Sequence, residues 1–297
     1  MISIQNFSKS FDNLKVIDDL SFDVKKGEIF AYLGANGSGK TTTLRALLGI
    51  YAADSGKLLI KGKPYSTEMS NLLGYLPEER GLYLESKVLE TMTYFGNLKG
   101  LTLSDSKKWS EKYLEEVDLG EKANEKIKNL SSGQQQKIQL GITIINKPKL
   151  LILDEPTKGL DPVNRDLLME KLLELHSEGA TILFSSHQME EVEKIADSVL
   201  MLKDGKAALY GDLEDIKKSF GENVIKLRFR GRLPRRTKFY EAKVEKNVAE
   251  LTPKDGVSNN DILNFLIKND VKVINFDVSS PSLHEIFVQI SKSDYEK

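Results

Sequence analysis

Short continuous apolar runs recur along the first two thirds of the chain. They are Leu150–Leu153, Thr181–Phe184 and Val199–Leu202. Amphipathic helical stretches alternate with them, and the clearest is Val163–His176, which places Leu167, Leu168, Leu172 and Leu175 on one side. Strands that are apolar throughout are typical of a parallel sheet covered by helices on both faces. The pattern therefore predicts an α/β fold.

The first hundred residues add a mixed pattern around another apolar strand. Two short strands, about Ile2–Phe7 and Leu20–Val24, precede the apolar run Glu28–Leu33. Lys25-Lys26-Gly27 separates the last two, and a turn of this kind predicts an antiparallel hairpin. A further short strand is expected at Lys57–Ile60, and the stretch from 88 to 117 is expected to be mostly helical. We therefore expect an antiparallel β subdomain and a helical subdomain beside the α/β core.

The character of the chain changes near Gly211–Phe220. The strand predicted at Val224–Arg230 alternates apolar Leu227 and Phe229 with basic side chains at 226, 228 and 230. Leu227 and Phe229 are expected to face a core. A helix at Asp261–Lys268, a strand at Val271–Val278 and a helix at Ser282–Ser291 follow. We predict two domains, residues 1–215 and a small α+β domain at residues 222–297.

Composition narrows the class of protein only a little. The 297 residues include 40% hydrophobic and 29% charged residues, which is ordinary for a folded soluble domain. The 43 Lys and Arg nearly balance the 44 Asp and Glu, so net charge supplies no argument for a nucleic-acid partner. The absence of cysteine excludes disulfides and thiolate chemistry. The N-terminus lacks a signal-peptide pattern, and no apolar run approaches the ~20 residues that span a bilayer.

A phosphate-binding loop follows the apolar strand Glu28–Leu33. Its residues are Gly34, Ala35, Asn36, Gly37, Ser38, Gly39, Lys40, Thr41 and Thr42. The spacing matches the pattern in which glycines turn backbone N–H groups toward an anion and a lysine reaches the β- and γ-phosphates. The Thr41 hydroxyl is placed to hold Mg²⁺, and the helix expected after the loop favours phosphate at its N-terminus. The chain is predicted to bind a nucleoside triphosphate.

A second motif, Leu130-Ser131-Ser132-Gly133-Gln134, stands before an apolar-periodic segment and roughly twenty residues before Leu150. By itself, a Ser-Ser-Gly turn entering a helix is most often a helix cap. With the phosphate loop before it and an apolar strand ending in Asp154-Glu155 after it, the chain resembles the ATP-binding cassette (ABC) family, the ATPase subunits of transporters. The family signature is Leu-Ser-Gly-Gly-Gln, and Ser132 departs from it by one hydroxymethyl group, which we expect to be tolerated.

The resemblance covers roughly residues 1 to 215 and implies a P-loop nucleoside triphosphate hydrolase core with a role for each matching residue. Asp154 would hold Mg²⁺ through water, and Glu155 would act on the attacking water as general base or orienter. His187 would contact the γ-phosphate, and Lys40 would join it and Glu155 in catalysis. Asp161, in Gly159-Leu160-Asp161, would cross toward the opposite subunit. Phe11 matches an aromatic that stacks on adenine, although an apolar core role is also open.

One position departs from the family in a way that bears on the chemistry. The family usually has glutamine at the start of the loop that senses γ-phosphate, and this chain has Glu78. A carboxylate can ligate Mg²⁺ but cannot donate a hydrogen bond, and it adds negative charge beside a triphosphate. We expect Glu78, with Thr41 and Asp154, to be a magnesium ligand. Residues 76–83 and the C-terminal domain also resemble a bacterial exporter branch that includes sodium-efflux ATPase subunits.

The resemblance implies that one chain is not a complete machine. The phosphate loop of one copy would bind ATP, and the Ser131–Gln134 segment of a second copy would close on it, so we expect a homodimer with ATP and Mg²⁺ as cofactors. Because no membrane span is expected, a separate integral membrane permease would carry the cargo, with this chain at the cytoplasmic face. Sodium, drug, peptide and lipid export all stay open.

One alternative class of protein is weighed against that interpretation, together with three roles for the basic strand. A soluble cassette ATPase acting on ribosomes or DNA is disfavoured, because the chain has a single phosphate loop and no heptad run between residues 40 and 130. The basic positions of Val224–Arg230 fit a solvated or dimer-packing face, a surface for anionic lipid or the membrane partner, or a nucleic-acid surface. Nucleic acid is not expected, since RNA-binding sheets show stacking aromatics among the charges.

Overall fold

The structure is a computed structural model of the chain that describes residues 1–79, 81–220, 224–235, 237–254, 256–279 and 281–293. Arg80, in the stretch 76–83, lies outside the described residues, as do residues 222, 223, 236, 255, 280 and 294–297 of the predicted second domain. The chain divides into two compact units, Met1–Asp212 and Leu213–Lys297. Each unit has a sheet and a hydrophobic core of its own. Among the described residues, no helix combines the length and apolar character needed to cross a membrane.

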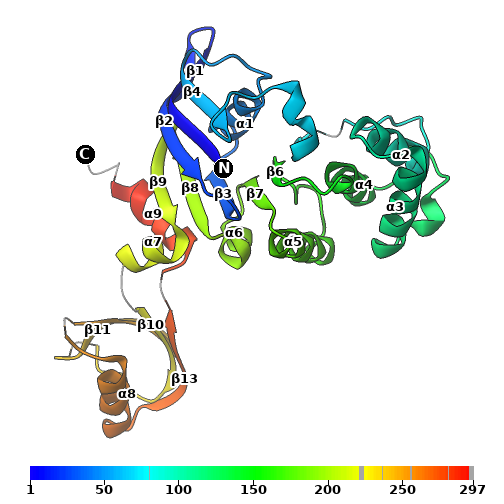
Figure 1. Ribbon diagram of the computed structural model, residues 1–297. Helices are drawn as coiled ribbons and strands as arrows, with labels where there is room; N and C mark the ends of the chain where they lie inside the picture. The colour runs from blue at the N-terminus through cyan, green and yellow to red at the C-terminus, as the bar shows by residue number, and fades with distance from the viewer. Residues whose placement is uncertain (80, 221–223, 236, 255, 280, 294–297) are drawn as a thin grey trace. The chain divides into compact units, whose positions relative to one another are not determined.

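A six-stranded sheet organises the first unit (Figure 1). Its order is β5-β6-β7-β3-β8-β9, with bounds Leu73–Leu76, Leu150–Leu153, Thr181–Ser186, Ile29–Gly34, Ser198–Lys203 and Lys206–Asp212. All neighbours pair in parallel except β8 and β9, which form an antiparallel hairpin. The side chains of β6 and β7 are buried along their whole length. The expected parallel sheet with apolar strands is present, with β9 as an antiparallel edge.

A three-stranded antiparallel sheet lies beside it, with order β2-β1-β4. Its strands span Ile2–Phe11, Leu14–Val24 and Ser55–Ile60 in chain order. The hairpin predicted at Lys25-Lys26-Gly27 is wrong, because β2 pairs with β1 and not with β3. Strand β3 is flanked by β7 and β8 and has no free edge for β2. The turn that joins the paired strands lies at residues 12–13 instead.

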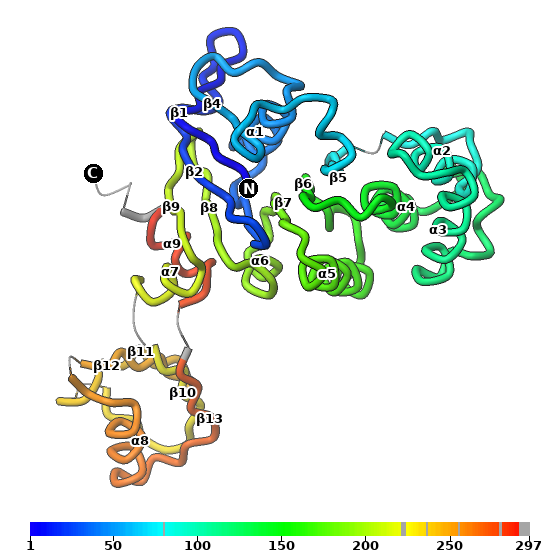
Figure 2. The backbone as a smooth tube through the Cα atoms, in the orientation of Figure 1, coloured from blue at the N-terminus to red at the C-terminus, as the bar shows by residue number. Residues whose placement is uncertain are grey.

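Helices cover both faces of the large sheet. α1 (Lys40–Leu47) contacts β3 and β4, while α5 (Pro162–Ser177) and α6 (Met189–Ile195) contact β7. A helical subdomain of α2 (Val88–Leu98) and α3 (Leu103–Glu116) lies at one end, joined through α4 (Ser132–Ile144), as the tube in Figure 2 shows. Short 3₁₀ turns complete the unit at Thr67–Leu72, Gly120–Lys122 and Ile127–Asn129.

The apolar stripe predicted on α5 is only half buried. Leu168 and Leu172 are buried, but Leu167 is 48% exposed and Leu175 is partly exposed. Leu167 and Leu168 both line a surface cavity of about 440 Å³ between α5 and the helical subdomain. The buried face of α5 is therefore narrower than its sequence predicts.

The second unit is a small α+β fold. Its sheet has the order β11-β12-β10-β13, with bounds Tyr240–Glu245, Val248–Pro253, Val224–Arg230 and Lys272–Ser279, and all pairs are antiparallel. α8 (Asn259–Lys268) contributes Ile262 and Leu266 to its core, and the helices α7 (Leu213–Ser219) and α9 (Leu283–Ser293) flank the sheet in sequence.

The alternation in β10 has the predicted orientation. Leu227 and Phe229 are buried in the core of this unit, and the basic side chains between them are exposed. Lys226 is paired across the strands with Glu250 and Asp277, and its ammonium lies 3.5 Å from the Glu285 carboxylate. Lys226 therefore has acidic neighbours that offset its charge, whereas Arg228 lies opposite Val248 and Asn275, and Arg230 lies opposite Lys272.

One lysine of the helical subdomain is partly buried without a carboxylate partner in the described contacts. Lys99, at the C-terminal end of α2, donates a hydrogen bond of 2.9 Å to the carbonyl of Thr143 in α4. Burial lowers the pKa of the Lys99 ammonium to about 8. Since its pKa in the unfolded chain is near 10.5, the unfolded chain binds the proton more tightly than the folded chain does between these two values.

We predict that Lys99→Met changes how stability depends on pH. Between pH 8 and 10.5 the folded wild-type chain has lost a proton that the unfolded chain keeps, so wild-type stability rises with pH relative to the variant, by about 3 kcal/mol in all. Urea unfolding across this range measures the difference. Lys112→Met, which removes an exposed lysine of the same subdomain, is the control. Parallel curves for wild type and Lys99→Met would contradict the assignment.

Candidate nucleotide-binding site

The chain's candidate site lies at the carboxyl edge of the parallel strands. The phosphate loop follows β3, Asp154 and Glu155 follow β6, and His187 follows β7. Glu78 follows β5, which is the next strand beyond β6. Because β5, β6, β7 and β3 are consecutive in the sheet and parallel, their carboxyl ends meet along one edge. The fold thus brings residues from four distant segments together.

The phosphate loop has a backbone that requires glycine. Gly39 is the N-cap of α1 with φ of 107°, which side chains rarely adopt. A Cβ on Gly34 would lie 2.5 Å from the Ser38 hydroxyl oxygen and 2.9 Å from the Leu202 carbonyl oxygen. The loop therefore forms a close-packed cradle that ends at a helix N-terminus, the arrangement expected to bind a phosphate group.

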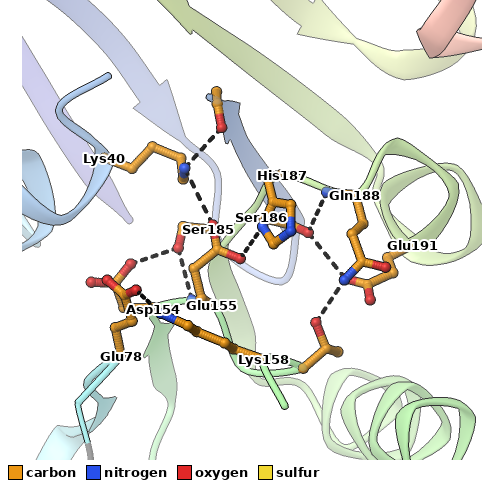
Figure 3. A network of polar contacts seen from close by, with 12 residues as sticks. Lys40, Glu78, Asp154, Glu155, Lys158, Ser185, Ser186, His187, Gln188 and Glu191 are labelled. Atoms are coloured by element: carbon orange, nitrogen blue, oxygen red, sulfur yellow. Dashed lines mark hydrogen bonds and ion pairs between the residues drawn. The ribbon is translucent and has the colours of Figure 1, made fainter. Parts of the chain in front are cut away.

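Lys40 bridges this cradle and the catalytic carboxylate predicted from the sequence. Its ammonium donates to the carbonyl oxygens of Gly34, at 2.8 Å, and Ala35, at 3.3 Å. It also lies 3.2 Å from Glu155 Oε1, with both side chains almost fully buried. The other oxygen, Glu155 Oε2, lies 2.8 Å from His187 Nδ1 (Figure 3). Glu155 is thus held between a lysine and a histidine.

The backbone at Glu155 has an uncommon conformation. Its φ is 49°, in the left-handed region that non-glycine residues seldom occupy. The Glu155 N–H donates to the Ser185 hydroxyl at 2.9 Å, and that hydroxyl donates to Asp154 Oδ1 at 2.6 Å. Ser185 therefore fixes both acids at the end of β6. A conformation that costs free energy and is held by neighbouring groups is typical of a functional site.

Asp154 has the features of a metal-binding carboxylate. Its Oδ2 atom is buried and makes no hydrogen bond within the described part of the chain. Burial raises the pKa of the Asp154 carboxyl, and the hydrogen bond from Ser185 opposes that shift. Glu78 Oε2 lies 3.5 Å from the Thr41 hydroxyl oxygen. Two carboxylates and a hydroxyl are hard oxygen donors of the kind that Mg²⁺ prefers, so these residues fit the ion implied by the family.

The loop residues and two acids share one cavity of about 170 Å³. Its lining residues are Val16, Asn36, Gly37, Gly39, Lys40, Thr41, Thr42, Glu78 and Glu155. Glu78 enters this cavity in an ion pair, because its Oε1 accepts a 2.6 Å hydrogen bond from the ammonium of Lys158. Lys158 holds the pKa of the Glu78 carboxyl below its usual range, so the group is charged.

The signature segment lies in a different cavity, of about 370 Å³, that shares no lining residue with the first. It includes Ser131, Ser132, Gly133, Gln134 and Asp161. Ser131 and Gln134 form a capping box on α4. The Ser131 N–H donates to the Gln134 side chain at 2.9 Å, and the Gln134 N–H donates to the Ser131 hydroxyl at 3.2 Å. Asp161 caps α5. Within one chain, the structure does not bring this predicted group to the phosphate loop.

Phe11 lies at the end of β1 and is 40% exposed. Its ring makes an edge contact with Tyr51 at 5.3 Å between centroids, and the Lys9 ammonium lies 5.3 Å from the Phe11 ring. The exposure argues against the core role that the sequence left open. Val16, and not Phe11, lines the cavity of the phosphate loop.

The sequence reasoning missed a buried polar network behind His187. Glu191 is 4% exposed, and its Oε2 accepts from the hydroxyls of Thr157, at 2.9 Å, and Ser186, at 3.0 Å. Its Oε1 lies 3.3 Å from Arg165 Nε, and Arg165 also donates to the Gln188 side chain at 2.6 Å. The network joins the ends of β6 and β7 to α5, and an acid four residues after a strand-end histidine was the available signal.

Taken together, the parallel sheet, the glycine-lined loop and the paired acids define a P-loop nucleotide-binding protein. Residues 17–158 match the family described as ABC transporter, and residues 211–291 match the C-terminal domain described as ATP-binding protein DrrA1-3-like. The chain belongs to the family of ABC transporter ATP-binding proteins, whose ATPase domain hydrolyses ATP.

Several relatives support that assignment over most or all of the chain. The uncharacterized ABC transporter ATP-binding protein YhaQ of Bacillus subtilis (strain 168) is 38% identical over 100% of both chains. Nod factor export ATP-binding protein I of Burkholderia pseudomallei (strain 1710b) is 37% identical over 71% of this chain and 70% of its own. A solved structure of the ATP binding subunit of an ABC transporter has a TM-score of 0.68 and 29% identity, covering 74% of this chain and 93% of its own.

We predict that Glu191→Ala destabilises the first unit. The change leaves the Arg165 guanidinium and two hydroxyls without their buried acceptor, which typically costs on the order of 3 kcal/mol. Urea unfolding of wild type and variant measures the loss. Glu190→Ala removes the exposed neighbouring acid of the same helix and is the matched control. A loss no larger than that of the control would contradict the role assigned to the network.

Proposed function

We propose that this chain hydrolyses ATP to ADP and phosphate and that a membrane subunit uses the hydrolysis for export. The observation that carries the proposal is the placement of Glu155 between Lys40, in the phosphate cradle, and His187. A carboxylate held there can accept a proton from water that attacks a phosphate bound in the cradle. The same residues without a base would bind nucleotide and leave it intact.

Each residue has a distinct part in that reaction. The backbone N–H groups of the cradle and the Lys40 ammonium bind the β- and γ-phosphates, and the charge they supply stabilises the transition state. Glu155 orients the attacking water or takes its proton, the new bond forms at the γ-phosphorus, and the bond to the ADP oxygen breaks. His187 contacts the γ-phosphate. Thr41, Asp154 and Glu78 would hold Mg²⁺, which supplies charge neutralisation between the phosphates.

The complete site is proposed to need two copies of the chain. The signature residues Ser131–Gln134 and Asp161 line a cavity apart from the phosphate loop. The N-terminus of α4 presents backbone N–H groups beside that cavity, and such an end favours an anion. In a head-to-tail homodimer the signature end of one copy would close on the γ-phosphate held by the other. Each of the two ATP molecules is then shared between two chains.

The transport role rests on the family and on the names of relatives. A relative is described as an export ATP-binding protein, and we propose the same direction of transport for this chain. An integral membrane permease would supply the path, with this chain bound peripherally at its cytoplasmic face. The identity of the cargo would be set by the permease.

We predict that Glu155→Gln keeps ATP binding and slows turnover by about two to four orders of magnitude, because the amide cannot take the proton of the attacking water. The unhydrolysed ATP should then hold two chains together as a dimer. Phosphate release and size-exclusion chromatography with ATP and Mg²⁺ measure the two effects, and Glu68→Gln, at an exposed site, is the control. Hydrolysis at the wild-type rate in Glu155→Gln would contradict the proposal.

We predict further that Glu78→Gln weakens the apparent affinity of the nucleotide site for Mg²⁺. The amide oxygen is a weaker ligand than the charged carboxylate, so the Mg²⁺ concentration at half-saturation should rise by about three- to tenfold. A Mg²⁺ titration of the binding of a fluorescent ATP analogue that resists hydrolysis measures this shift. An unchanged midpoint would remove Glu78 from the proposed metal ligands.

A further inference from the structure

The carboxylate of Glu78 is divided between two partners. Its Oε1 accepts the 2.6 Å hydrogen bond from Lys158, and its Oε2 is the atom that faces the Thr41 hydroxyl. With one oxygen held by the lysine, rotation of the carboxylate is restricted, and the other oxygen stays directed toward the proposed metal ligands. The Lys158 ammonium and the Thr41 hydroxyl thus lie on opposite sides of one carboxylate (Figure 3 shows the lysine side).

Backbone hydrogen bonds constrain the loop that carries Lys158. The Lys158 N–H donates to the Glu155 carbonyl at 3.0 Å, and the Leu160 N–H donates to the Thr157 carbonyl at 3.1 Å, so residues 155–160 form consecutive turns. Glu78 follows Pro77, whose carbonyl lies 3.4 Å from the Gln139 side-chain nitrogen on α4. Two locally constrained segments present the lysine and the carboxylate to each other.

The local charge explains why a lysine is needed here. Glu78, Asp154 and Glu155 place three carboxyl groups around the place expected for a triphosphate, which is itself strongly negative. An amide at 78 would add no charge and would need no cation. A carboxylate at 78 adds one negative charge, and the Lys158 ammonium adjacent to it offsets that charge. The lowered pKa of Glu78 agrees with this pairing.

We propose that Lys158 is a positioning residue for Glu78: it fixes the carboxylate with Oε2 toward Thr41 and neutralises the charge that this carboxylate brings to the nucleotide site. The inference rests on the proposed function, in particular on Glu78 as a ligand of Mg²⁺. Among the proposed metal ligands, Glu78 is the one that Lys158 contacts in the described part of the chain. Its effect on nucleotide binding passes through Glu78.

The competing explanation is an ordinary surface ion pair without consequence for nucleotide. The Lys158 side chain is 60% exposed, and exposed pairs commonly contribute little to stability. A double-mutant cycle separates the two explanations, because a positioning role disappears when the carboxylate is absent. The four proteins are wild type, Lys158→Gln, Glu78→Gln and the double variant.

The measurement is the Mg²⁺ midpoint for binding of a fluorescent, hydrolysis-resistant ATP analogue to the full-length chain. Lys158→Gln should raise the midpoint by about two- to fivefold in the presence of Glu78, and should have no effect in the Glu78→Gln background. Lys158→Arg keeps the cation and should restore the wild-type midpoint. Circular dichroism melting identifies any variant that has lost its fold, and such a variant is replaced by Lys158→Met in the same cycle.

A matched control comes from another ion pair of the same unit. Lys194 lies 2.9 Å from Asp166, and its side chain is also 60% exposed, but it lines no cavity of the nucleotide site. Lys194→Gln should leave the midpoint unchanged. Equal effects of Lys158→Gln with and without Glu78 would overturn the positioning role, while hydrolysis of ATP by those same proteins would leave the proposed function intact. Absence of ATP binding by wild type would instead remove the proposed function.

Discussion

The whole account depends on how a cluster of buried charge is balanced at one edge of the parallel sheet. Glu155 is almost fully buried, and it is tolerated there because Lys40 and His187 contact its two oxygens. A buried carboxylate without such partners would lose its charge or destabilise the fold. The same lysine is the group that we propose binds the triphosphate. A nucleotide bound to this ammonium would therefore change the ion pair between Lys40 and Glu155.

That coupling suggests how the site moves between states. In this structure the Lys40 ammonium donates hydrogen bonds to the loop carbonyls and forms an ion pair with Glu155. A triphosphate bound in the cradle would compete with Glu155 for this ammonium, and Glu155 would then be available to water. Behind the site, the bonds from Arg165 and Glu191 connect the His187 segment to α5, whose N-cap is Asp161. If a second chain contacts Asp161, a contiguous set of polar contacts could transmit the resulting displacement to His187.

Much of the fold could be read from the sequence because its strongest patterns are local. The apolar strands at 150–153 and 181–184 and the glycine loop have few alternative structures, and each is present. The hairpin at Lys25-Lys26-Gly27 was wrong because strand pairing depends on which edges are free, and that is a property of the whole sheet. Strands β11 and β12 were missed although more buried and more exposed positions alternate along both, the same pattern that predicted β10. Lys158 contacts Glu78, 80 residues away in the sequence, and no local spacing predicts such a pair.

The central claim is that residues of two chains together complete each nucleotide-binding site. Because the chain lacks cysteine, introduced cysteines allow a direct test. One preparation carries Asn36→Cys in the phosphate loop, and the other carries Ser132→Cys in the signature segment. After mixing under mild oxidation, we expect a disulfide between the two preparations in the presence of ATP and Mg²⁺, and none without nucleotide. A cross-link that forms equally with and without ATP, or that never forms when the membrane subunit is also present, would contradict the shared site.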